Sequence, residues 1–157
     1  MRRALQMREL IRRRMAVSAG GSMSEVYQPF AVGELASIPA DVEDRLYQRI
    51  DETLKRYRRV ILPASIQAEF EALPNIIEPI AQTHNDIVDY IVANMYVPSG
   101  RIMSGLIELQ RLYVKYSDML RRRAQYLHKP MPSLTPLKTL PFVIISAVKG
   151  RFRRALR

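Results

Sequence analysis

Prolines divide this chain into stretches in which apolar residues recur every three or four positions. That spacing places apolar side chains on one side of an α-helix, whereas a half-buried strand requires alternation at every second residue. The stretches are 40–62, 63–73, 76–97 and 101–128, and a proline stands at or near each boundary, at positions 63, 74, 98 and 130. The sequence has neither sustained alternation nor an Asn-Gly or Asp-Gly turn. The pattern therefore predicts an all-α fold.

Three of the predicted helices are of medium or greater length and one is short, which indicates a small helical bundle. The helix over 76–97 has a wide apolar sector and should be the most buried. Its stripe consists of Ile80, His84, Ile87, Ile91 and Met95. The helix over 101–128 has a main apolar row at near-heptad spacing and a second row, Met103, Ile107 and Val114, which we expect to contact another neighbour.

Charge is distributed unevenly along the 157 residues, whose formal net charge is +10. Residues 1–24 and 121–157 are strongly basic, whereas residues 25–120 carry more acidic than basic side chains. We therefore predict three segments: a basic N-terminal helix and arm over 1–38, the helical bundle over 39–128, and a proline-rich strap followed by a basic, apolar C-terminal helix over 129–157. Proline, glycine and serine in 16–38 and 129–141 predict irregular arms that rest on other chains.

The first fifteen residues contain six arginines and one acidic residue, and a stretch of small residues follows them. This composition resembles a mitochondrial targeting presequence. The alternative is a basic arm of a cytosolic or viral structural protein. The sequence favours a mitochondrial location, peripheral to the inner membrane.

The C-terminal segment combines a short apolar run with basic residues and has no acidic residue after position 118. The run is too short to span a bilayer, but it suits a helix at an anionic membrane surface or at a protein interface. The candidate interface or lipid-binding residues are Phe142, Val143, Ile144, Lys149, Arg151, Arg153, Arg154 and Arg157. Two alternatives remain: the apolar run packs on the bundle, or the basic residues bind RNA phosphate.

No catalytic, cofactor-binding or metal-binding motif emerges from the sequence. The chain has no cysteine, which excludes disulfides, thiol catalysis and cysteine-ligated metals. His84, with Asp86 and Asp89, is the best constellation, but the spacing of these residues does not match a metal site, and we expect a buried histidine that donates a hydrogen bond to a neighbouring helix. No nucleotide-binding glycine loop is present, so no cofactor is predicted.

These observations favour a protein that is not an enzyme. The first hypothesis is a structural or accessory subunit of a large mitochondrial inner-membrane complex, of the respiratory-complex or ATP-synthase type, which contributes assembly and interface contacts. Its partners would be other protein subunits and anionic lipid. The alternative is an RNA-associated structural protein, either an organellar ribosomal protein or a virion component, whose basic tails bind nucleic acid. The acidic body argues against this alternative.

Overall fold

The structure is a computed structural model that describes the backbone of residues 35–156 and the side chains as far as Arg151. In this part of the chain, four helices account for most of the residues: α3 (Ala40–Tyr57), α4 (Ile66–Ala93), α5 (Gly100–Tyr126) and α6 (Phe142–Leu156). Two short strands, β1 (Ala36–Ser37) and β2 (Tyr96–Val97), pair in parallel. The predicted all-α class is confirmed. Of the basic arm predicted over residues 1–38, residues 1–34 lie outside the described residues.

The described residues form two compact units. The larger unit contains residues 41–86 and 100–138, and the smaller one contains residues 87–99 and 139–156 together with the residues around β1. Helix α4 contributes its first three quarters to the larger unit and its end to the smaller one. Each unit has its own buried apolar side chains.

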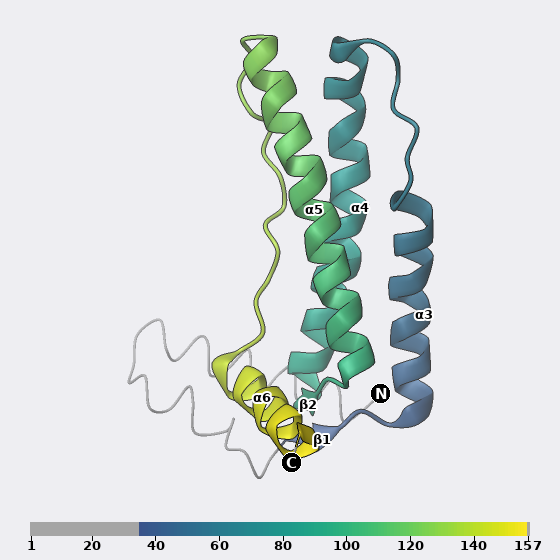
Figure 1. The fold of residues 1–157 in the computed structure, drawn as a ribbon, viewed down its shortest axis with the longest axis vertical. Helices are drawn as coiled ribbons and strands as arrows, with labels where there is room; N and C mark the ends of the chain where they lie inside the picture. Colours follow the sequence, from purple (N-terminus) through teal and green to yellow (C-terminus); the bar gives the residue numbers. More distant parts are fainter. Residues whose placement is uncertain (1–34, 157) are drawn as a thin grey trace. The chain divides into compact units, whose positions relative to one another are not determined.

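Three helices lie side by side in the larger unit (Figure 1). Helices α3 and α4 are antiparallel, since the hydroxyls of Thr53 and Thr83 are hydrogen-bonded at 2.8 Å. Helix α5 runs antiparallel to α4 and beside α3, where Gly105 lies directly against Ile50. The core is aliphatic, and its fully buried residues include Ile50, Leu73, Ile77, Ile80, Ile102, Leu106, Leu109 and Leu120. These residues belong to the stripes that the sequence predicts, so the helical periodicity identifies the core correctly.

Helix α3 ends earlier than predicted. The apolar stripe indicated a helix as far as residue 62, but the last helical residue is Tyr57, and Ile61 is 98% exposed. The hydroxyl of Tyr116 in α5 donates a hydrogen bond to the Tyr57 carbonyl, which is the carbonyl that the amide of Ile61 would use in a longer helix. A tertiary hydrogen bond therefore occupies a carbonyl that a longer helix would use.

Helix α4 corrects the prediction of two separate helices, because it continues through Pro74 and Pro79 without a break. A proline inside a helix has no N–H for the carbonyl four residues earlier and disfavours the helical conformation of the residue before it, at a cost of about 3 kcal/mol. Leu73, Ile77 and Ile80 surround the two prolines and are fully buried. Their burial stabilises the continuous helix by about 1.5–3 kcal/mol for each side chain, which offsets this cost.

The smaller unit is built around the end of α4, the strand pair and α6. Ile87, Val88 and Ile91 of α4 are buried, as is Ile144 of α6. The strands pair Ala36 with Tyr96 and Ser37 with Val97. The guanidinium of Arg151 donates a hydrogen bond to the hydroxyl of Ser37 at 2.6 Å. Within the described residues, this two-residue pairing is the whole of the sheet.

The residues between α5 and α6 form an irregular strap, as predicted. Residues 129–138 of the strap run along the helices of their own unit (Figure 1), and contact of the strap with other chains stays a prediction. Lys129 at its start donates a hydrogen bond to Gln67 of α4, and Thr135 contacts both α4 and α5. None of the helices within residues 35–156 is long and apolar enough to cross a membrane.

Candidate protein interface

The C-terminal candidates do not form one exposed apolar surface. Ile144 is fully buried, and Val143 is half-buried, so these two side chains belong to the packing of the smaller unit. Phe142 is 81% exposed, and Lys149 and Arg151 are exposed. The side chains of Arg153 and Arg154, and the whole of Arg157, lie outside the described residues. Burial of Ile144 agrees with the alternative in which the apolar run packs within the protein.

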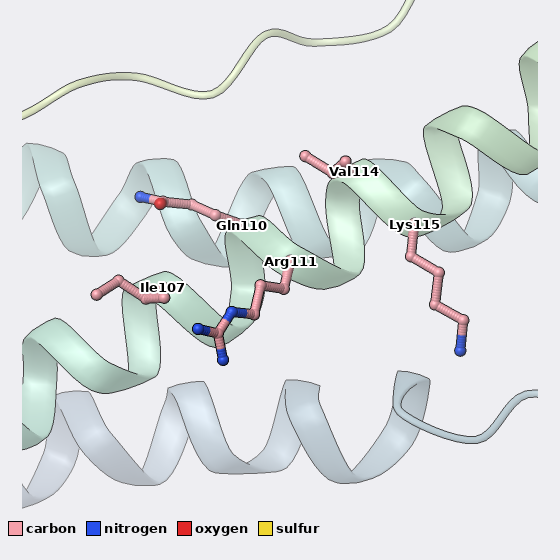
Figure 2. Close-up of a pocket in the computed structure, with 5 residues that line it drawn as sticks. All are labelled: Ile107, Gln110, Arg111, Val114 and Lys115. Carbon is pink, nitrogen blue, oxygen red and sulfur yellow. The ribbon is translucent and has the colours of Figure 1, made fainter.

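An exposed apolar surface lies instead on α5. Ile107 is 40% exposed and Val114 is 55% exposed, although both belong to the second apolar row of a helix whose other row is buried. Together with three polar neighbours, they line a shallow surface depression of about 370 Å³. The five lining residues are Ile107, Gln110, Arg111, Val114 and Lys115 (Figure 2). We call this depression the α5 groove.

The two basic side chains that line the α5 groove contact neighbours on their own helix. Arg111 pairs with Glu108 one turn before it, at 3.4 Å, and the Lys115 ammonium lies 5.3 Å from the centre of the Tyr116 ring. In Figure 2, Arg111 and Lys115 extend toward α3, whereas Gln110 and Val114 lie on the side of the strap. The groove therefore has a basic side and a side that is neutral.

A buried histidine fixes Gln110. The Gln110 amide nitrogen lies 3.0 Å from Nε2 of His84, and Nδ1 of His84 lies 3.0 Å from the Asn85 side-chain oxygen. An amide nitrogen can only donate, so Nε2 accepts and the imidazole proton resides on Nδ1, from which it is donated to Asn85. The prediction of a buried histidine bonded to a neighbouring helix is confirmed, but His84 accepts this bond rather than donating it.

Asn85 connects the same histidine to the strap. Its side-chain nitrogen donates to the Pro136 carbonyl at 3.0 Å, and its oxygen accepts the amide of Lys138 at 2.8 Å. Asn85 is only 6% exposed, so these bonds replace the water that a polar side chain would otherwise require. A continuous chain of hydrogen bonds thus leads from Gln110 in the α5 groove through His84 and Asn85 to the strap.

Thr135 provides a second attachment of the strap. Its amide and its hydroxyl donate to the two carboxylate oxygens of Glu78 at 2.9 Å and 2.7 Å, and its carbonyl accepts the Tyr113 hydroxyl at 2.8 Å. Burial raises the pKa of Tyr113 above its usual value, and the negative charge of Glu78 adds to this effect. The phenol therefore remains a hydrogen-bond donor at neutral pH. These bonds fix the strap along one side of α5.

The titratable groups near the groove serve structural roles. Burial lowers the pKa of His84 below 6.5, so its imidazole is neutral at pH 7, and both ring nitrogens are engaged. Asp86, which the sequence placed beside His84, pairs with Arg49 of α3 and accepts a bond from Gln82. Within residues 35–151, no group of three or more histidine, aspartate and glutamate side chains is arranged to hold a metal ion.

Comparison of the chain with protein-family models, with curated proteins and with solved structures gives no match.

Sequence reasoning identified Ile107 and Val114 as a second row that needs a neighbour, but it did not single out Gln110, Arg111 or Lys115. The available signal was the helical position of these three residues, which follow that row at spacings of one to four. Their roles depend on which neighbours lie beside α5. Neither the His84 contact of Gln110 nor the position of the strap can be deduced from spacing within one helix.

Proposed function

We propose that the protein is a non-enzymatic structural subunit of a larger protein assembly. The observation that carries this proposal is the α5 groove, in which two apolar side chains of a regular helix are exposed between fixed polar neighbours. Scattered apolar residues are normal on protein surfaces, but neighbouring ones on a rigid element favour contact with another protein. The groove lies on α5, whose opposite side is packed in the core, so a partner would meet a surface that is already formed.

The strap supports the same function. Its attachment to the bundle uses Glu78, Asn85 and Tyr113, three side chains that bond its backbone at positions 135, 136 and 138. This attachment gives the surface beside α5 a defined form without any regular secondary structure. A preorganised surface loses little conformational entropy on binding, which suits a subunit whose role is to make permanent contacts.

The arrangement near the groove favours binding over catalysis. General acid–base catalysis requires a group that can exchange a proton with a substrate, and the side chains that line the groove are apolar, amide or permanently cationic. His84 lies behind Gln110 with both nitrogens hydrogen-bonded. The groove therefore has the character of a contact surface.

We propose further that the assembly is a mitochondrial inner-membrane complex of the respiratory-complex or ATP-synthase type. This part of the proposal is supported by the sequence alone, namely the arginine-rich residues 1–24 and the basic C-terminal segment. Lys149 and Arg151 are exposed on α6, where Arg151 also bonds to Ser37, and we expect both to face an acidic subunit or anionic headgroups. Ile144 is packed within the protein, and among the side chains of α6 described as far as residue 151, Phe142 is the large apolar one that is exposed and that we expect to enter a lipid surface.

The test is the native size of the protein in the organism that produces it. The full-length protein carrying a small C-terminal tag is extracted in mild detergent, with and without nuclease, and its particles are separated by size. We expect a particle far larger than the 18.2 kDa chain that survives nuclease. A monomer in the mildest extract would refute the proposal. Release by nuclease would favour the RNA-associated alternative, since phosphate contacts would then hold the protein in place.

A further inference from the structure

We propose that the α5 groove binds one helix of a partner subunit, and that this helix presents an apolar row flanked by acidic side chains. This inference rests on the proposed function and specifies the partner's chemistry. The groove is centred on a row of α5 that consists of Met103, Ile107, Gln110 and Val114, in which Gln110 is the polar member; we call it the outer row. These residues are separated by four, three and four positions, which is the rhythm with which two packed helices meet.

The outer row lies on the solvent side of α5, and its apolar exposure is greatest at its centre and end. Met103 is half-buried, Ile107 is 40% exposed and Val114 is 55% exposed. Residues seven apart lie two turns apart on the same face, so Ile107 and Val114 can anchor successive apolar residues of one partner helix. Gln110 lies between them and is fixed by His84, which leaves the depression into which a partner side chain can insert.

Charge identifies the partner as acidic. Arg111, Lys115 and Arg122 follow one another along α5 beside the outer row, and all three are exposed. Glu108 lies near both Arg58 and Arg111, and Asp118 pairs with Arg121, so the two acidic residues of this part of α5 balance only part of its basic charge. The basic row therefore exceeds the acidic charge around it. A partner with glutamate or aspartate along its flank would complement it, as flanking charges do in paired helices.

The same charges disfavour two other occupants, a second copy of α5 and the chain's own basic residues 1–15. A second copy of α5 would bring another basic row toward the first, with Glu108 and Asp118 already paired within each copy. The N-terminal segment of the chain carries six arginines and one glutamate in residues 1–15, so it would add positive charge to a positive surface. Like charges that face each other across an interface reduce affinity and select against the wrong partner.

The first experiment measures binding of model helices to the full-length protein. One peptide has three heptads with leucine at the core positions and glutamate at the flanking positions, and the matched peptide has lysine in place of glutamate. Fluorescence anisotropy of labelled peptides reports the dissociation constants. We expect the acidic peptide to bind at least about tenfold more tightly than the basic one, a difference of about 1.4 kcal/mol, and this preference to weaken as salt is added. Equal affinities, or a preference for the basic peptide, would overturn the proposal.

Two double variants assign the binding to the groove. Ile107→Ser with Val114→Ser removes the apolar contacts and should weaken binding of the acidic peptide about tenfold or more. Arg111→Glu with Lys115→Glu should reverse the preference, so that the basic peptide binds better. Arg45→Glu on the exposed side of α3 is the control for charge reversal, and Ile61→Ser is the control for loss of an exposed apolar side chain. Binding that is unaffected by both double variants would overturn the assignment to this groove.

The same variants in the native organism separate this inference from the proposed function. If the tagged protein migrates in a large particle and the Ile107→Ser, Val114→Ser variant leaves that particle, both statements are supported. If the variant remains in the particle as firmly as the unchanged protein, the protein is a subunit but its partner does not bind the groove, and the inference is wrong. A purified protein that forms a dimer, which the same variant dissociates, would identify a second copy as the occupant and would also refute an acidic partner helix.

Discussion

Helices α3 and α5 approach each other at Gly105, and the closeness of this contact can be tested by adding a single methyl group. A Cβ atom at position 105 would lie 2.9 Å from Cγ2 and 3.2 Å from Cδ1 of Ile50. Unstrained carbon atoms pack about 3.5–4.0 Å apart, so the nearer contact is too close by about 0.6 Å. Ile50 is fully buried, and its β-branched side chain has one strongly preferred rotamer in a helix. Cγ2 therefore cannot move away without strain.

Two opposing effects determine the stability of the Gly105→Ala variant. Alanine is more favourable than glycine inside a helix by about 0.8–1.0 kcal/mol. Overpacking a core contact of this kind costs about 1–3 kcal/mol. We therefore expect a net destabilisation of about 1 kcal/mol, which corresponds to a fall in melting temperature of about 2–4 °C for a domain of this size. The free energy of unfolding from urea titration is the appropriate measurement.

A second substitution, at Ile50, should reverse the sign of the stability change that Gly105→Ala causes. In an Ile50→Ala background the close contact is absent, so Gly105→Ala should stabilise the protein by up to about 1 kcal/mol through helix propensity. The Ile50→Ala change itself should cost about 2–5 kcal/mol, because a fully buried side chain is lost. Gly100→Ala, where an added Cβ would have no atom within 4 Å, is the control. If Gly105→Ala stabilises the protein equally in both backgrounds, α3 and α5 are not in close contact.

Three further predictions follow from the hydrogen bonds and the helix ends. Burial lowers the pKa of His84, so the unfolded chain binds a proton more readily than the folded one, and the stability contributed by the neutral imidazole is present above pH 6.5 and is lost as the pH falls below it. Urea titrations at pH 7.5 and pH 5.5 give the free energy of unfolding at each pH. We expect these two values to differ less in His84→Gln than in the unchanged protein. Asn85→Ala removes the bonds to Pro136 and Lys138 and should make the strap the first site of limited proteolysis, an expectation that unaltered cleavage kinetics would contradict. His128 has a φ of 53°, a backbone conformation that glycine adopts more easily than a residue with a Cβ atom, so His128→Gly should leave the stability unchanged or raise it by up to about 1 kcal/mol. A loss of more than about 1 kcal/mol in thermal unfolding would show that the histidine side chain has a further role.

The sequence predicted most of the helices, and the reasons for its errors are local. Periodicity identified the fully buried residues Ile80, Ile91 and Leu106, because a buried stripe must follow the helical repeat. It failed at Pro74, where burial of neighbouring side chains favours a continuous helix, and at Ile61, whose apolar character suggested burial although the side chain is exposed. In both places the deciding interaction comes from another element, which a pattern within one segment does not contain.

The ends of two helices were also difficult to predict because glycine, the usual residue at such ends, is absent there. Met95 follows α4 with a φ of 56°, and His128 follows α5 in the same left-handed conformation. At the end of α5 the amide of Lys129 bonds to the carbonyl of Ala124, which closes the helix in the manner usually associated with glycine. Proline at position 98 or 130 marked each region correctly, but the terminal residue was set by these backbone bonds.

The candidate interface was predicted in part. The second row of α5 implied that Ile107 and Val114 need a neighbour, and the structure leaves them exposed within the described residues. The C-terminal candidates were chosen from composition, which cannot distinguish an apolar run that covers the protein's own core from one that meets a lipid. Ile144 shows the difference, since it is fully buried in the smaller unit. Exposure depends on the tertiary fold, and it makes α5 rather than α6 the candidate contact surface.

Gln110 explains why the outer row of α5 can be exposed without being a generally adhesive surface. A leucine at this position would extend the apolar row from Ile107 to Val114, but it would leave Nε2 of the buried His84 without its donor, at a cost of about 1–3 kcal/mol. A polar side chain in the middle of an apolar row also restricts which helices can pair with it and in which register. The hydrogen bond from Gln110 thus satisfies a buried imidazole, and in the proposed interface it would also hold a polar residue where it limits the choice of partner helix. The same imidazole bonds to Asn85, which holds the strap, so the residues that fix the strap also fix the groove beside it.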